Sequence, residues 1–134
     1  SDIIKKGAFS TSNNYEFFLK QVLEYHETES PISHIKKYEI IKGDASIEIE
    51  KYLMEHPETI ISFAYFDMDL YEPTKKCLEL IMDHVTKGTI IGFDELNHRD
   101  FPGETTALKE VIGIKNCRIK RTHFSAHQSY IEII

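Results

Sequence analysis

Two apolar runs that do not alternate with polar residues constrain the fold of this chain most strongly. They are "TIISFAYF" (residues 59–66) and "GTIIGFDE" (residues 88–95). Strands of this type are buried on both faces, as in parallel sheets covered by helices. Pro73 suits a first helical turn and Gly88 a helix end. Apolar residues between the two runs recur at helical spacing, namely Cys77, Leu78, Ile81 and Val85. This strand–helix–strand order predicts an α/β fold with a largely parallel sheet.

The rest of the chain extends the same pattern. We expect a helix within residues 10–30, with Asn13 and Glu16 as a capping box. Further expected elements are a strand at 36–44, helices at 46–56 and 103–113, and an antiparallel strand pair at 117–122 and 129–134. The prediction is therefore one α/β domain over residues 1–134.

Composition excludes several classes of function. The chain has 134 residues, 41% of them hydrophobic, and a net charge of −6 with scattered acids. This balance argues against a nucleic-acid partner, and no run is apolar and long enough to cross a membrane. Cys77 and Cys117 are isolated, so we interpret them as small hydrophobic residues of a protein in a reducing compartment, the cytoplasm.

Acidic side chains follow the expected strands at the ends where an open parallel sheet binds its ligand. Asp44 follows the first strand, Asp67 and Asp69 the second, and Asp94 and Glu95 the third. Asp67 and Asp69 share one face of the extended chain. Like charges this close repel unless a cation, a proton or a substrate holds them together. These acids therefore indicate a candidate site.

Asp67, Asp94 and Glu95 could bind one hard divalent cation such as Mg²⁺, because carboxylate oxygens are its preferred ligands. The alternative is that these acids only cap helices or face solvent. Asp69 could be a general base for a substrate hydroxyl or an outer ligand of the ion. Histidines in nearby loops are expected to be solvated, although the first could reach the site: His98, His123 and His127.

The segment "YFDMDLYEPTKKCLELIMDHVTKGTIIGFDELNHRDFPGETTALKEV" resembles the macrocin O-methyltransferase family. The resemblance covers residues 35–112 and rests on joint spacing: a strand ending in D-x-D-L-Y, a second strand ending in Asp94-Glu95, and a Pro102-Gly103 segment that opens a helix. It implies a Rossmann-like class I methyltransferase that uses S-adenosylmethionine and methylates a hydroxyl of a sugar or nucleotide-sugar.

The resemblance also implies roles for single residues. Mg²⁺ would be held by Asp67, Asp94 and Glu95, with Asp69 as the catalytic base. Asp44 or Ala45 would contact the adenine of the cofactor, and Asp67 would also face the cofactor. Glu95 departs from the family, which commonly has a second aspartate there.

A larger departure is the absence of a Gly-rich cofactor turn, since no two of the six glycines are separated by a single residue. We therefore expect a truncated methyltransferase domain that carries the metal and acceptor side. In the usual strand order, further strands lie between residues 36–44 and 59–66. Their absence predicts an exposed sheet edge and a possible homo-oligomer formed through it.

Three other interpretations stay open. A haloacid-dehalogenase-like phosphohydrolase would use Asp67 as nucleophile and Asp69 as acid/base, although Tyr71 stands where such enzymes carry a small β-branched residue. A glycosyltransferase could hold a nucleotide-sugar through D-x-D and manganese. A non-catalytic binding module could keep the methyltransferase fold without its cofactor.

Overall fold

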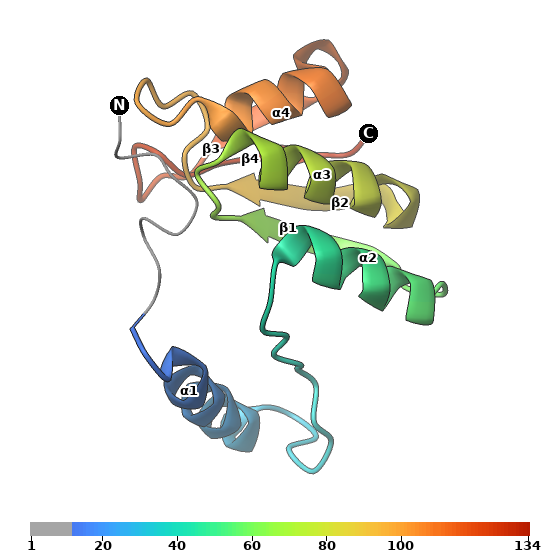
Figure 1. Cartoon of the computed structure of the whole chain (residues 1–134), viewed down its shortest axis with the longest axis vertical. Coiled ribbons are helices and arrows are strands. Elements are labelled where there is room, and N and C mark those ends of the chain that lie inside the picture. The colour runs from blue at the N-terminus through green and yellow to red at the C-terminus, as the bar shows by residue number, and fades with distance from the viewer. Residues whose placement is uncertain (1–11) are drawn as a thin grey trace.

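The structure of this protein is a computed structural model that describes residues 12–134. Within them the strands form a four-stranded sheet in the order β1-β2-β4-β3. β1 (Ile61–Phe66) pairs in parallel with β2 (Val85–Phe93), and β4 (Ser129–Glu132) lies antiparallel between β2 and β3 (Arg118–Arg121). The helices α2 (Ala45–Glu55), α3 (Tyr71–Ile81) and α4 (Gly103–Val111) lie side by side on one face of the sheet (Figure 1).

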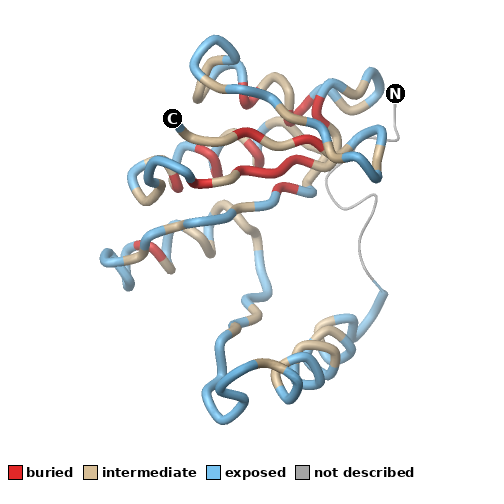
Figure 2. The backbone as a smooth tube through the Cα atoms, turned by 180° about the vertical axis from the view of Figure 1, so that it is seen from behind, coloured by how far each residue is buried: buried red, intermediate tan, exposed pale blue. Residues whose placement is uncertain are grey.

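The core lies between this helical layer and the sheet. Cys77, Leu78 and Ile81 of α3 point inward, and Phe66 of β1 stacks on Phe93 of β2 with ring centroids 5.5 Å apart. The buried stretches of β2 and β4 form the centre of the sheet (Figure 2). Burying a side chain of this size contributes about 1.5–3 kcal/mol, so this layer holds the strand ends of the site in place.

The predicted α/β class and the C-terminal antiparallel pair are confirmed. The strand predicted at residues 36–44 is wrong, since this stretch is extended but belongs to no sheet. A strand needs a hydrogen-bonding partner, and no strand of residues 12–134 lies between it and β1. Consequently only the β1–β2 pair is parallel, and β1 is an edge strand.

Burial of β1 on both faces was also predicted, and this is wrong. Phe63 is 61% exposed and Tyr65 46% exposed. Successive side chains of a strand point to opposite faces, so both lie on the face opposite to that of the buried Phe66. An apolar run can therefore form a strand that is buried on only one of its faces.

The boundary between α3 and β2 also differs from the prediction. α3 ends at Ile81, the 3₁₀ helix η1 (Met82–His84) follows, and Val85 begins β2. Gly88 lies inside the strand with φ +89°, a left-handed conformation that glycine adopts readily. The register of β1 against β2 shifts between Ile61 and Phe63, as at a β-bulge.

The helix α1 (Tyr15–Glu29) lies apart from the sheet and buries none of its residues (Figure 1). The predicted capping box is wrong, because Asn14 is the N-cap and makes no side-chain cap hydrogen bond. Lys42 Nζ reaches Glu16 Oε1 at 2.7 Å and ties α1 to the segment before α2. Among the described residues, no helix has the length and apolar character needed to cross a membrane.

Candidate active site

The acids at the ends of β1 and β2 emerge side by side. Phe66 pairs with Phe93 in register, and the amide of Asp94 donates to the carbonyl of Phe66 at 3.0 Å. Asp67 and Asp94 therefore leave the same edge of the sheet. Burial, followed by the charges of Asp94 and Asp69, raises the pKa of the Asp67 carboxyl above its ordinary value. A bound cation would relieve the part of this shift that comes from the neighbouring charges, and the roles predicted for Asp67, Asp69 and Asp94 stay predictions.

Two polar side chains orient Asp94. Tyr65 donates its hydroxyl to Asp94 Oδ1 at 2.6 Å, and Gln128 donates from Nε2 to the same oxygen at 3.1 Å. Burial and the neighbouring Asp94 carboxylate raise the pKa of the Tyr65 phenol. Neither residue was predicted. Tyr65 could have been found, because its side chain lies on the same strand face as Asp67. Gln128 depends on the register of β4 against β2, which no local pattern gives.

The segment around Asp69 is held by the start of α4. Asp69 has φ +55°, an uncommon left-handed conformation for a non-glycine residue. A Cβ on Gly103 would lie 2.5 Å from the carbonyl oxygen of Asp69 and 2.6 Å from the amide nitrogen of Tyr71. Only glycine therefore lets α4 approach this closely. This contact explains the Pro102-Gly103 segment in physical terms.

Glu104, in the first turn of α4, lies beneath the site and was not predicted. It is fully buried, and its Oε2 accepts the amide of Glu95 at 2.9 Å. Its Oε1 accepts no hydrogen bond from the residues that the structure describes. Burial raises the pKa of Glu104 to about 7, although the nearby backbone of Glu95 and Met68 acts in the opposite direction. Nothing in its helical position distinguishes it from an exposed glutamate.

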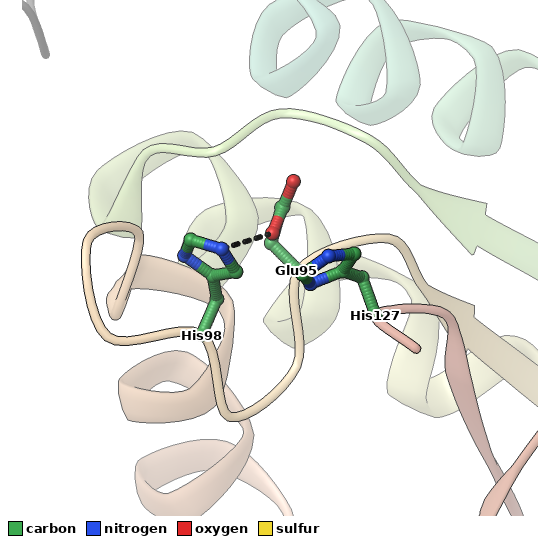
Figure 3. A group of neighbouring side chains, drawn as sticks. All are labelled: Glu95, His98 and His127. Atoms are coloured by element: carbon green, nitrogen blue, oxygen red, sulfur yellow. Dashed lines mark ion pairs between the residues drawn. The ribbon is translucent and has the colours of Figure 1, made fainter. Parts of the chain in front are cut away.

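The carboxylate of Glu95 lies against histidines. Its Oε2 is 3.7 Å from Nε2 of His98, and His127 approaches the same group from the loop before β4 (Figure 3). His98 is thus within reach of the site, as one reading of the sequence allowed. His123 is exposed. It stays a prediction that one ion is bound by Glu95 together with Asp67 and Asp94.

The two residues predicted at the adenine lie at the start of α2. Asp44 is the N-cap, and its Oδ1 accepts the amide of Ser46 at 3.1 Å and its hydroxyl at 2.7 Å. Ala45 lines an apolar groove of about 560 Å³ between α2 and β1, together with Tyr52, Phe63 and Met68. Asp44 faces a neighbouring hollow beside Tyr71. The apolar lining of this groove suits a flat apolar group.

Comparisons with known proteins place this geometry in context. No protein-family model and no curated protein matches the chain. Among solved structures, an apo structure of CalS11, a TDP-rhamnose 3'-O-methyltransferase of calicheamicin biosynthesis, is 37% identical over 91% of this chain with a TM-score of 0.84. A second structure of CalS11, described as a calicheamicin methyltransferase, is 37% identical over 95% of the chain with a TM-score of 0.87.

The chain spans about half the length of these structures, 54% and 50% respectively. The likeness extends over nearly all of this chain in both sequence and fold. The predicted resemblance is confirmed: over most of its length this chain is similar in sequence and fold to about half of a protein described as a sugar O-methyltransferase.

Proposed function

We propose that this chain forms the metal and acceptor side of an S-adenosylmethionine-dependent O-methyltransferase that acts on a sugar hydroxyl. The observation that carries the proposal is the meeting of Asp67, Asp69 and Asp94 at adjoining strand ends, in a chain 37% identical to a sugar O-methyltransferase. The acceptor is a deoxysugar, free or nucleotide-linked. TDP-rhamnose, the sugar named for CalS11, is the first compound to test.

The carboxylate site suits a hard cation such as Mg²⁺. Asp67 and Asp94 leave adjoining strand ends, and burial followed by the charges of Asp94 and Asp69 raises the pKa of Asp67. We propose both as ligands and Glu95 as the third, since carboxylates are the ligands that Mg²⁺ prefers. When bound, the ion lowers the pKa of a coordinated hydroxyl. Tyr65 and Gln128 keep Asp94 oriented toward this task.

Asp69 is the proposed base. Its carboxylate is close enough to Asp67 to affect the Asp67 pKa, and its backbone is held by the contact with Gly103. S-adenosylmethionine, when bound, supplies the methyl group. Asp69 would take the proton of the acceptor hydroxyl as the hydroxyl oxygen accepts that methyl group. Asp69 and the buried residues beneath it would orient the acceptor hydroxyl and exclude water from it.

The cofactor side is only partly present in this chain. We propose that Asp44, Ala45 and Asp67 contact S-adenosylmethionine, with the adenine in the apolar groove beside Ala45. The sequence contains no Gly-rich turn for the remainder of the cofactor. The free thiols of Cys77 and Cys117 are compatible with the proposed cytoplasmic setting.

A second candidate is a binding module that holds the sugar and the cation without transferring a methyl group. The missing Gly-rich turn favours it. It differs from the first candidate in one measurable respect. The module binds the sugar, whereas the enzyme also labels it.

The test is transfer of a radiolabelled methyl group from S-adenosylmethionine to TDP-rhamnose in the presence of Mg²⁺. Asp69→Asn should abolish the label, and Asp83→Asn, an exposed aspartate in η1, should leave it unchanged. Sugar binding without label in the unaltered chain would select the binding module. Neither label nor binding of any deoxysugar nucleotide would overturn both candidates.

A further inference from the structure

A second group of metal-ligating side chains lies beside the aspartates. Glu95 follows β2, His98 lies in the loop before α4, and His127 lies in the loop before β4 (Figure 3). One ligand atom of each lies within 4.8 Å of those of the other two. The rings of His98 and His127 have centroids 5.0 Å apart. Two segments distant in sequence, the one after β2 and the loop before β4, therefore bring two imidazoles and one carboxylate to one point.

One carboxylate oxygen of this group lacks a hydrogen-bond partner among the described residues. Oε2 of Glu95 is buried and accepts no hydrogen bond within residues 12–134. Nε2 of His98 lies 3.7 Å from this oxygen, which is too far for a hydrogen bond. A buried polar atom without a partner costs about 1–3 kcal/mol. An ion between Glu95 and the histidines would remove this cost.

The donor set indicates which ion this is. Imidazole nitrogen favours zinc, cobalt, nickel and copper, whereas magnesium and calcium prefer an all-oxygen shell. Two histidines and one carboxylate, with water in the remaining position, are a common zinc ligand set. With metal–ligand bonds of about 2.1 Å, a tetrahedral ion holds its ligands about 3.4 Å apart. The three side chains must close by about 1 Å, and the exposed His127 has room to do so.

Coordination through His98 has a further consequence. Nδ1 of His98 now accepts the amide of Asp100 at 3.2 Å, so the neutral ring carries its proton on Nε2. A metal on Nε2 requires the proton to move to Nδ1, and the amide of Asp100 then loses its acceptor. This bond is long, so its loss costs little. The amide resonance of Asp100 is therefore a local reporter of metal binding.

We propose that Glu95, His98 and His127 form a binding site for a first-row transition-metal ion of the zinc class. The site is distinct from the aspartate site in its histidines and shares Glu95 with the magnesium ligands proposed above. A zinc-class ion and Mg²⁺ therefore compete for one carboxylate. Substitutions of the histidines, and not of Glu95, therefore distinguish the two sites in an experiment.

The test is titration of the chain, without an affinity tag, with Co²⁺ as a spectroscopic substitute for Zn²⁺. We expect a visible d–d absorption band and displacement of Co²⁺ by Zn²⁺. His98→Ala and His127→Ala should each weaken Co²⁺ binding at least tenfold. His123→Ala removes an exposed histidine from the same loop as His127 and should leave binding unchanged. Asp67→Asn should also leave it unchanged.

Circular dichroism would establish that each variant is folded, and His127→Ala suffices should His98→Ala fail to fold, because His127 is exposed. Equal Co²⁺ affinity in the chain and in His127→Ala would overturn the proposal, as would the absence of any band. In either case Mg²⁺ binding and methyl transfer, which depend on Asp67 and Asp69, would be unaffected. Failure here is thus distinguishable from failure of the proposed function.

Discussion

At the scale of single residues, Glu104 is a buried carboxyl group that lies beneath the site. Its carboxyl is fully buried, holds the amide of Glu95 through one oxygen, and leaves the other without a partner among the described residues. Burial of this kind favours the neutral acid. The α4 helix thus presents a protonated or half-protonated carboxyl to the segment that carries Glu95.

Glu104→Gln tests this arrangement through the pH dependence of stability. The folded-state pKa of about 7 lies above the ordinary value of 4.5, so the folded form retains a proton that the unfolded chain loses. The contribution of Glu104 to stability is therefore greatest below about pH 4.5 and falls by about 3 kcal/mol as the pH rises to 7. Glutamine keeps the acceptor without the charge and should remove this fall.

Chemical denaturation at pH 5 and pH 8, with a chelator present, measures the effect. We expect Glu104→Gln to gain on the unaltered chain by about 1–3 kcal/mol at pH 8 and much less at pH 5. Glu79→Gln, an exposed position on α3, is the control. An identical pH profile for the unaltered chain and Glu104→Gln would contradict the assigned burial.

At the scale of elements, the sequence predicts the helices and strands that local patterns determine. It does not predict contacts between residues that are distant in the sequence. The helix after Pro73 and the strands on either side of it were predicted because apolar spacing over ten residues determines them. The strand at 36–44 was wrong because a strand requires a neighbour that spacing does not report. Glu104 and Gln128 were missed for a related reason, since both join the site only through tertiary packing.

The entry of α4 gives a prediction at this scale. Gly103→Ala places a Cβ about 2.5 Å from backbone atoms of residues 69–71, which cannot rotate away. We expect a loss of about 1–3 kcal/mol in stability, as in other overpacked contacts, and slower methyl transfer through displacement of Asp69, the proposed base.

Gly43→Ala is the matched control. Its Cβ would meet only the side chain of Glu48, which can move. Denaturation midpoints of the two variants measure the contrast. Equal stability of Gly103→Ala and Gly43→Ala would show that the contact between α4 and residues 69–71 is looser than described.

At the scale of the whole molecule, the exposed edge of the sheet is the main departure from an ordinary α/β domain. Among the described strands, β1 lies at one edge of the sheet and β3 at the other, and Phe63 and Tyr65 of β1 are exposed. An unpaired apolar edge is a template for pairing with another chain. We propose that a second copy covers it and that the chain forms a homo-oligomer.

Phe63→Lys introduces a charge on the exposed face of this edge strand and should shift the chain toward monomer in sedimentation velocity. Phe124→Lys carries the same change at a loop residue that is 99% exposed, and it should leave association unchanged. A monomer at all concentrations before substitution would exclude the oligomer. So would a decrease of the same size in both variants.

The measurement that tests the account most directly is calorimetric titration of the chain with Mg²⁺, repeated on Asp94→Asn. The account places the ion between the ends of β1 and β2, where Asp67 and Asp94 repel each other. It predicts measurable binding that weakens at least tenfold in Asp94→Asn and persists in His98→Ala. Absence of Mg²⁺ binding, or equal affinity in Asp94→Asn, would contradict the carboxylate site and the function built on it.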